Sequence, residues 1–244
     1  MPKSYPIPQD PIGETFVWRD WFQRLSNKVF GTAAAIDVPV APIYGGTGQS
    51  TCNTGDIFYS NATDHITRLP KPTEKSMLVM TSAGVPSWLP YVYGSFSSTT
   101  TQSVSVINTP TLVTFDTTDY SSHTSRTSNK LYVDTAGLYN VQFSLQATNS
   151  DAQAHDADIW IRKNGTDIAN SASVFSVHGS HGGQPGYQIV AANFFIRFAA
   201  NDYVEFWWSS NSTQIQLNYL PAITTPFTSP GAPSIVCTIS YVND

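Results

Sequence analysis

From residue 93 to the C-terminus, short apolar and aromatic runs alternate with turns rich in Gly, Asn, Asp and Pro. In residues 138–146 the apolar positions Tyr139, Val141, Phe143 and Leu145 alternate with polar ones. A period of two sends one set of side chains into a core and the other set outward. The pattern therefore predicts an antiparallel all-β sandwich. The expected strands are 102–107, 111–115, 130–134, 138–147, 157–163, 166–176, 188–199, 203–209, 213–219 and 234–242.

Two local signals add detail to this pattern. Asn164-Gly165, between apolar runs, predicts a two-residue hairpin turn of type I′. Residues 14–30 predict one helix, because their apolar side chains recur at helical spacing. These side chains form one stripe: Trp18, Trp21, Phe22, Leu25 and Val29. A short helix with such a stripe needs a surface to cover it. The residues leave open packing on the same chain, anchoring to a partner, or association of three helices around a symmetry axis.

The segment between the helix and the sandwich is rich in Gly, Thr and Pro and predicts short strands alternating with turns. Its GGTGQS stretch at 45–50 lacks the Gly-Lys-Ser/Thr ending of a phosphate-binding loop and opens no helix, so a turn is expected. Three regions follow: an N-terminal arm with an anchoring helix (1–36), a β connector (37–92) and a head domain (93–244).

Composition restricts the function further. Only 12% of the residues are charged, the 12 Lys and Arg are scattered, and the net charge is −5, which argues against a nucleic-acid partner. No apolar run has the length of a membrane span or of a signal peptide, so neither membrane insertion nor that export route is expected. Cys52 and Cys237 show no spacing typical of a disulfide framework.

The sequence offers little chemistry. His178 and His181 are three residues apart and could share a metal with Asp156 or Asp158, but their loop is Gly-rich and fixes no fourth ligand, so solvated histidines are expected. We find no nucleophile, base or metal constellation of a known catalytic type. The sequence therefore predicts a protein that is not an enzyme and has no cofactor.

Aromatic residues are dense in FFIRF (194–198) and DYVEFWW (202–208). Successive strand residues face opposite ways, so both faces of these strands are apolar in places. A covered outer face, most economically covered by a symmetry-related copy, is the first interpretation. Stacking on a sugar is the second. The candidates for either contact are Phe195, Trp207, Trp208 and Tyr219.

Several segments resemble a known class of proteins. YGSFSSTTTQSVSVINTPTLVTFDTTDYSS (93–122), TAGLYNVQFSLQAT (135–148), DIWIRKNGTDIANS (158–171), FAANDYVEFWWSS (198–210) and PGAPSIVCTISYV (230–242) resemble the globular head of bacteriophage structural proteins, which is similar to the C1q/TNF-like jelly roll. The GGTGQ…GDIFY…ITRL segment and WRDWFQRLS resemble connector and anchoring segments of phage fibre proteins. Acidic calcium ligands that C1q-like proteins often carry have no match here, so calcium is not expected.

The resemblance implies a homotrimer of jelly rolls, made in the host cytoplasm and attached to the virion by its N-terminal section. The first hypothesis is a capsid decoration or cement protein, or a short head fibre, in contact with the major capsid protein. The distance from helix to head favours this, because about 60 residues span at most ~3.3–3.6 Å each. The alternative is a receptor-binding or adaptor tail fibre, in contact with tail or portal proteins, that recognises host surface glycan. A sugar-active enzyme is a third class.

Overall fold

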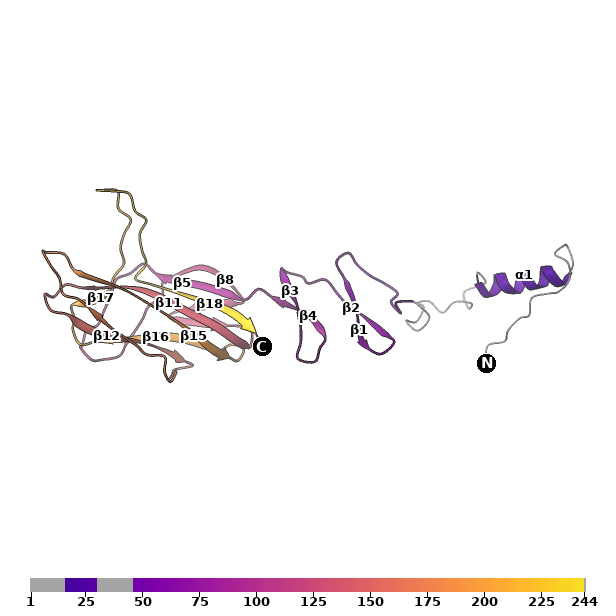
Figure 1. Ribbon diagram of the computed structural model, residues 1–244, viewed down its shortest axis with the longest axis horizontal. Coiled ribbons are helices and arrows are strands. Elements are labelled where there is room, and N and C mark those ends of the chain that lie inside the picture. The colour runs from indigo at the N-terminus through magenta and orange to yellow at the C-terminus, as the bar shows by residue number, and fades with distance from the viewer. Residues whose placement is uncertain (1–15, 30–45, 244) are drawn as a thin grey trace. The chain divides into compact units, whose positions relative to one another are not determined.

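The computed structural model describes residues 16–29 and 46–243 (Figure 1). Expectations that concern residues 1–15, 30–45 and 244 lie outside the described residues. The chain forms two compact units, Met1–Leu89 and Pro90–Asp244. Most of the structure is β-strand, as predicted, and the single short helix of the described residues is α1 (Phe16–Val29), within the predicted range 14–30.

The connector forms two antiparallel hairpins, in agreement with the predicted alternation of strand and turn. β1 (Ile57–Ala62) pairs with β2 (His65–Leu69), and β3 (Ser76–Met80) pairs with β4 (Pro86–Pro90). The carboxylate of Asp56 accepts hydrogen bonds from the backbone N–H of Asn53 (2.7 Å) and Lys71 (2.9 Å), and these bonds lower the pKa of Asp56. The GGTGQS stretch opens no helix in its described part, and the Gln49 amide donates to the backbone oxygen of Ile66 (2.9 Å).

The C-terminal unit is a sandwich of two antiparallel sheets, each of seven strands among the described residues. The first, here the β11 sheet, runs β15-β11-β18-β5-β8, with β17 and β6 extending from β11. The second, the β16 sheet, runs β14-β12-β16-β10-β9, with β13 beside β12 and β7 beside β16. The strands are β5 (Tyr93–Ser98), β6 (Gln102–Ser103), β7 (Thr111–Leu112), β8 (Thr117–Ser122), β9 (Thr124–Thr127), β10 (Lys130–Val133), β11 (Gly137–Asn149), β12 (His155–Lys163), β13 (Thr166–Asp167), β14 (Ser173–Val177), β15 (Gly186–Phe198), β16 (Tyr203–Ser210), β17 (Ile215–Leu217) and β18 (Ile235–Asn243).

The core lies between the two sheets and confirms the alternation predicted for 138–146. The alternating residues Tyr139, Val141, Phe143 and Leu145 of β11 are all buried, and they meet buried residues of the β16 sheet such as Ile161 and Phe206. The Phe206 ring packs edge-on against Phe143 (5.5 Å between centroids) and Phe115 (5.8 Å). Asn164 (φ 51°) and Gly165 (φ 81°) both take left-handed backbone angles, which confirms the predicted type I′ turn.

Four predicted strands are divided or shortened in the structure, among them 213–219, which is reduced to β17. The predicted strand 166–176 is divided into β13 and β14, because Asn170 turns the chain at φ 63°. At this turn the backbone N–H of Ile161 on β12 donates to the Ser171 hydroxyl (3.1 Å) instead of to a backbone oxygen of a neighbouring strand. Residues 102–107 and 111–115 shrink to β6 and β7, of two residues each. β8 and β9 were not predicted, because their Ser- and Thr-rich sequence has no apolar alternation.

The strand registers define two ends of the sandwich. The chain enters at Tyr93, which pairs with Ser240 near the C-terminus. β11 runs from that end to Asn149 at the other, where β14 and β16 also end. This distal end therefore gathers the loops 150–154, 178–185 and 211–214.

Candidate functional site

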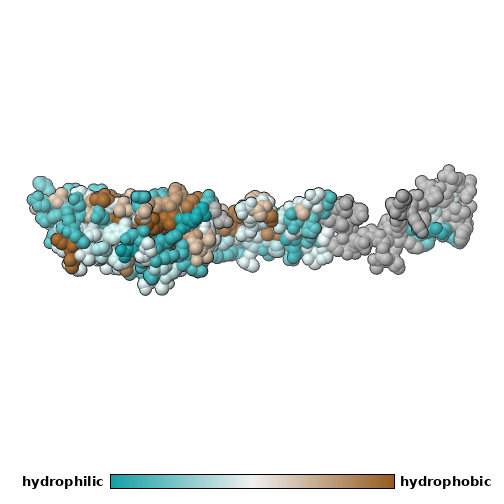
Figure 2. Space-filling view, turned by 90° about the horizontal axis from the view of Figure 1, so that it is seen from below, coloured by the Kyte–Doolittle hydropathy of each residue, from teal (hydrophilic) through white to brown (hydrophobic). Residues whose placement is uncertain are grey.

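The outer face of the β11 sheet carries large apolar side chains that nothing in its own unit covers. Tyr120 is 73% exposed, Phe195 65% and Ile189 63%. The register puts Phe195, Asn140, Ser240 and Tyr93 in one row across β15, β11, β18 and β5. Apolar residues therefore border both sides of this face. Figure 2 shows apolar residues, in brown, gathered over part of the C-terminal unit among hydrophilic ones.

Between these borders the face is polar but almost without charge. Its central positions are Gln142 and Ser144 on β11, with Thr238 on β18. Within β15, β11, β18, β5 and β8, the charged side chains on this face are Asp119 and Arg197, near its margins. Asp119 accepts hydrogen bonds from the hydroxyls of Ser97 (3.0 Å) and Ser95 (3.3 Å). We call this surface the uncharged face.

The outer face of the β16 sheet has the opposite character. Trp160 lies directly opposite Trp207, and the Arg162 guanidinium lies over the Trp207 ring, 4.2 Å from its centroid. The Asp167 carboxylate accepts from Arg162 Nε (2.5 Å) and Trp160 Nε1 (2.8 Å), and these bonds lower the pKa of Asp167. Lys130 lies over the Tyr203 ring at 4.4 Å. On this face the rings of Trp207 and Tyr203 therefore have cationic partners from their own chain, and Trp160 has a hydrogen-bond partner.

The four aromatic candidates therefore separate. Phe195 is on the uncharged face, whereas Trp207 is on the other sheet beneath Arg162. Trp208 was wrong as a surface candidate, because it is fully buried opposite Ile159 in the core. Consecutive strand residues face opposite ways, so Trp207 and Trp208 cannot share a surface. Tyr219 is half-buried, and its backbone N–H donates to the Thr101 hydroxyl (3.1 Å).

The sequence candidates missed Ile189 and Tyr120. Ile189 lies six residues before Phe195 on the same strand, so an even separation places both on one face. The period of two along this strand could therefore have identified Ile189 from the sequence. No sequence pattern could have identified Tyr120, because it is the only apolar or aromatic residue in a Ser- and Thr-rich strand.

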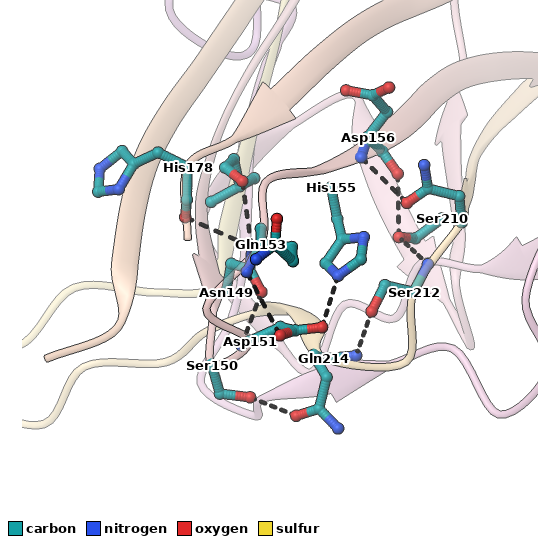
Figure 3. A network of polar contacts seen from close by, with 12 residues as sticks. Asn149, Ser150, Asp151, Gln153, His155, Asp156, His178, Ser210, Ser212 and Gln214 are labelled. Carbon is teal, nitrogen blue, oxygen red and sulfur yellow. Dashed lines mark hydrogen bonds and ion pairs between the residues drawn. The ribbon is translucent and has the colours of Figure 1, made fainter. Parts of the chain in front are cut away.

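The distal end holds a network of polar contacts, shown in Figure 3. Asn149, fully buried at the end of β11, donates from Nδ2 to the backbone oxygens of Gln153 (2.8 Å) and Val177 (3.1 Å). Its Oδ1 accepts from the Asp151 N–H (3.0 Å). The Asp151 carboxylate contacts His155 Nε2 at 2.8 Å, and this hydrogen bond lowers the pKa of Asp151.

Further contacts join the other distal loops to this network. The Asn211 side chain accepts from the Asp156 N–H (3.1 Å), and Ser150 is hydrogen-bonded to Gln214 through both backbone and side chain. A Cβ added to Gly186 would lie 1.8 Å from the backbone oxygen of His178, so only glycine fits this crossing. These bonds hold the three loops in a fixed arrangement.

The histidine pair does not meet its proposed ligands. His178 and Asp156 lie on opposite sides of His155 in Figure 3, and Asp158 pairs with Val174 and Ser209 on its flanking strands. His181 pairs through its backbone with Gln184. Among the residues that the structure describes, no three His, Cys, Asp or Glu side chains gather to hold a metal ion.

The helix α1 carries a cluster of aromatic rings. Trp21 packs edge-on against Trp18 (5.9 Å) and Phe22 (5.1 Å between centroids). Phe22 and Leu25 are 50% and 42% exposed. Val29 ends the helix, but its side chain is outside the described part. The exposed stripe is therefore available for contact at Phe22 and Leu25, while Asp20 and Arg24 form an ion pair on another side (2.9 Å).

Comparison of the sequence with models of protein families and with curated proteins gives no match. Among the described residues, the helix α1 is too short and too polar to cross a membrane.

Proposed function

We infer that this protein is a non-enzymatic structural protein of a bacteriophage virion, a homotrimeric capsid decoration or cement protein, or a short head fibre. The observation that carries this proposal is the difference between the two outer faces of the sandwich. On the β16 sheet Arg162 pairs with both Trp207 and Asp167, whereas the uncharged face exposes Phe195, Ile189 and Tyr120. Exposed apolar surface with few charges is typical of contacts between subunits.

The arrangement of strands supports the jelly-roll part of the proposal. Jelly rolls are double-sheet sandwiches in which eight strands form two Greek keys. Here each sheet contains a run of four neighbouring strands, β15-β11-β18-β5 in one and β14-β12-β16-β10 in the other. The chain changes sheet at most steps, and the first and last of these strands, β5 and β18, are neighbours. This order also fits the resemblance to the C1q/TNF-like heads, whose threefold assembly the proposal adopts.

The N-terminal unit supports attachment to the particle. α1 exposes Phe22 and Leu25 on one side, and isolated helices of this length need a packing surface to be stable. We assign that surface to a protein of the virion shell. The two short hairpins of the connector then link the anchor to the trimeric unit, and the contacts of the uncharged face hold the three copies together.

The distal end favours a second candidate, the receptor-binding or adaptor tail fibre that recognises host surface glycan. Its hydrogen-bonded loops present a fixed, polar surface at the end opposite the entry of the chain. However, in the loops 149–157 and 177–187 the only Phe, Tyr or Trp is Tyr187, which is 50% exposed, so a sugar ring would find a single aromatic side chain there rather than several stacked ones. The shell protein therefore remains the first candidate.

Two measurements test the proposal. Sedimentation analysis of the purified protein should give three times the chain mass of 26.7 kDa. Quantitative peptide mass spectrometry of purified virions should give copies of this chain comparable to those of the major shell protein. A few copies per particle would support the tail-fibre candidate instead, and absence from virions would refute both.

A further inference from the structure

An arm projects from the C-terminal unit between β17 and β18. Figure 1 shows its two legs, residues 218–233, leaving the sandwich side by side and ending in a tip away from every other strand of the unit. Backbone hydrogen bonds join the legs in pairs, between Leu220 and Ala232 (2.9 and 2.8 Å) and between Ile223 and Ser229 (3.0 and 2.9 Å). The arm is therefore an ordered hairpin that contacts the unit only at its base.

The arm is apolar at its tip and has no charge. Residues 218–234, NYLPAITTPFTSPGAPS, include no Asp, Glu, Lys or Arg. Phe227 is 63% exposed and Ile223 is 39% exposed. An isolated two-stranded hairpin is only marginally stable in water, so an arm of this kind gains stability when a second surface covers it.

Prolines determine how such a surface can bind. Pro221, Pro226, Pro230 and Pro233 fix their own backbone angles and have no N–H to donate. They reduce the conformational entropy that the arm would lose on docking. They also leave gaps in the row of backbone N–H groups with which an added strand would have to pair. The arm is thus suited to docking through side chains, with Phe227 as its largest apolar group.

The base of the arm belongs to the β11 sheet. The Asn218 N–H donates to the Gln146 oxygen on β11 (2.7 Å), and the Ser234 N–H donates to the Ser98 oxygen on β5 (2.9 Å). The arm is therefore continuous with the sheet whose outer side is the uncharged face. Legs of about six residues reach roughly 20 Å, which equals the width of about four paired strands.

We propose that the arm docks on a neighbouring copy of this chain, with Phe227 packed against apolar residues of the neighbour's uncharged face. This inference rests on the proposed homotrimer and names a contact that holds it together. A second copy is the occupant because the arm starts from the sheet that forms the proposed subunit contact. The arm has no charged residue, and the charged side chains of the uncharged face, Asp119 and Arg197, lie near its margins, so contact over the rest of that face removes no ion from water.

Photo-crosslinking tests the contact directly. The full-length protein is made with p-benzoylphenylalanine in place of Phe227, and a matched control carries the same group in place of Val174, which is 74% exposed on the β16 sheet. Mixed trimers of isotopically heavy and light chains are irradiated. We expect adducts between chains for position 227, mapped by mass spectrometry to β15, β11 or β8, and none for position 174.

Three results would overturn the inference, and the first two are distinct from failure of the trimer itself. Adducts only within one chain, or none, in a protein that sediments as a trimer would refute the arm contact alone. Adducts of position 227 with the shell protein in irradiated virions, without adducts between copies, would refute it too. A monomer in sedimentation would refute the trimer and the arm contact together.

A side-chain variant gives an independent readout. Because Phe227 is exposed and far from the core, Phe227→Ser should fold normally. We expect it to raise the dissociation constant of the trimer about tenfold or more, the effect typical of truncating an aromatic anchor. An unchanged dissociation constant in a folded variant would contradict the docking of this ring.

Discussion

Phe195 on β15 lies directly opposite Asn140 on β11, and the two side chains share the outer face of the β11 sheet. The phenyl ring is 65% exposed, while the amide oxygen of Asn140 is buried without a hydrogen-bond partner. An exposed ring beside a buried, unpaired carbonyl is unfavourable for a single chain in water. A second chain on this face would remove the ring from water, which is why this row belongs to the proposed subunit contact.

The first prediction compares the two outer faces with matched substitutions. Ile189→Ser on the uncharged face should raise the dissociation constant of the trimer about tenfold or more, because it removes a β-branched side chain from the contact. Val174→Ser on the β16 sheet removes a side chain of similar shape that is 74% exposed. Sedimentation equilibrium measures both. Equal effects of the two variants, or a larger effect of the control, would contradict the assignment of the interface.

The second prediction concerns the core. Phe143 is 1% exposed and packs on Phe206, so Phe143→Ala should lower the free energy of unfolding by about 3–5 kcal/mol per chain. Phe195→Ala removes the same group from the surface and should cost far less in the unassembled chain. Chemical denaturation at a concentration below the dissociation constant of the trimer separates the two effects. A loss under about 1 kcal/mol at Phe143 would show that the core can close the cavity.

Much of the fold followed from periodicity, which is strongest where one face of a strand is buried. In β11 the burial of Tyr139, Val141, Phe143 and Leu145 enforces a strict period of two, so the strand was predictable within two residues at either end. β8 and β9 have no such constraint. Backbone hydrogen bonds stabilise them instead, between β8 and β5 and between β9 and β10. The pattern of residues within a strand does not indicate which other strand it pairs with.

The candidate surface was less predictable than the fold. Aromatic density indicated a covered face, but density alone could not separate Phe195, which is outside, from Trp208, which is inside. Cation-π contact between Arg162 and Trp207 depends on strand register, so the sequence could not show that this ring is covered. The arm at 218–233 was missed because its prolines fit no helical or strand periodicity.

The third prediction concerns pH. The hydrogen bond from His155 lowers the pKa of Asp151 below its ordinary value of 3.8 in the folded protein. A lowered folded-state pKa means that the bond stabilises the distal loop above the pKa of the unfolded chain. That contribution is lost as the pH falls through the folded-state pKa, below 3.8.

Substitutions near this carboxylate test the cause of the shift. His155→Gln should return the pKa of Asp151 toward 3.8, measured from the ¹³C shift of its carboxyl carbon. His178→Gln is the control, because the hydrogen bond of that ring is to the backbone oxygen of Gly179 rather than to Asp151. If both variants, or neither, move the titration of Asp151, then His155 is not the cause.

The last prediction concerns the anchor. Trp21 and Phe22 form the ring cluster of α1 with Trp18, and Phe22 is half exposed. Replacing Trp21 and Phe22 together by Ala should release the protein from virions, because a contact with the shell would lose two aromatic groups.

The control for the anchor uses the polar side of the same helix. Asp20→Ala with Gln23→Ala changes two residues that lie outside the aromatic stripe and keeps good helix-forming residues in place. Virions lacking the protein are incubated with each variant and pelleted, and bound copies are counted by mass spectrometry. Both variants should remain trimeric, because the proposed subunit contact lies in the C-terminal unit. Normal binding by the aromatic variant would assign attachment to another part of the chain. If the aromatic variant alone were monomeric, α1 would instead be a contact between the subunits of the trimer.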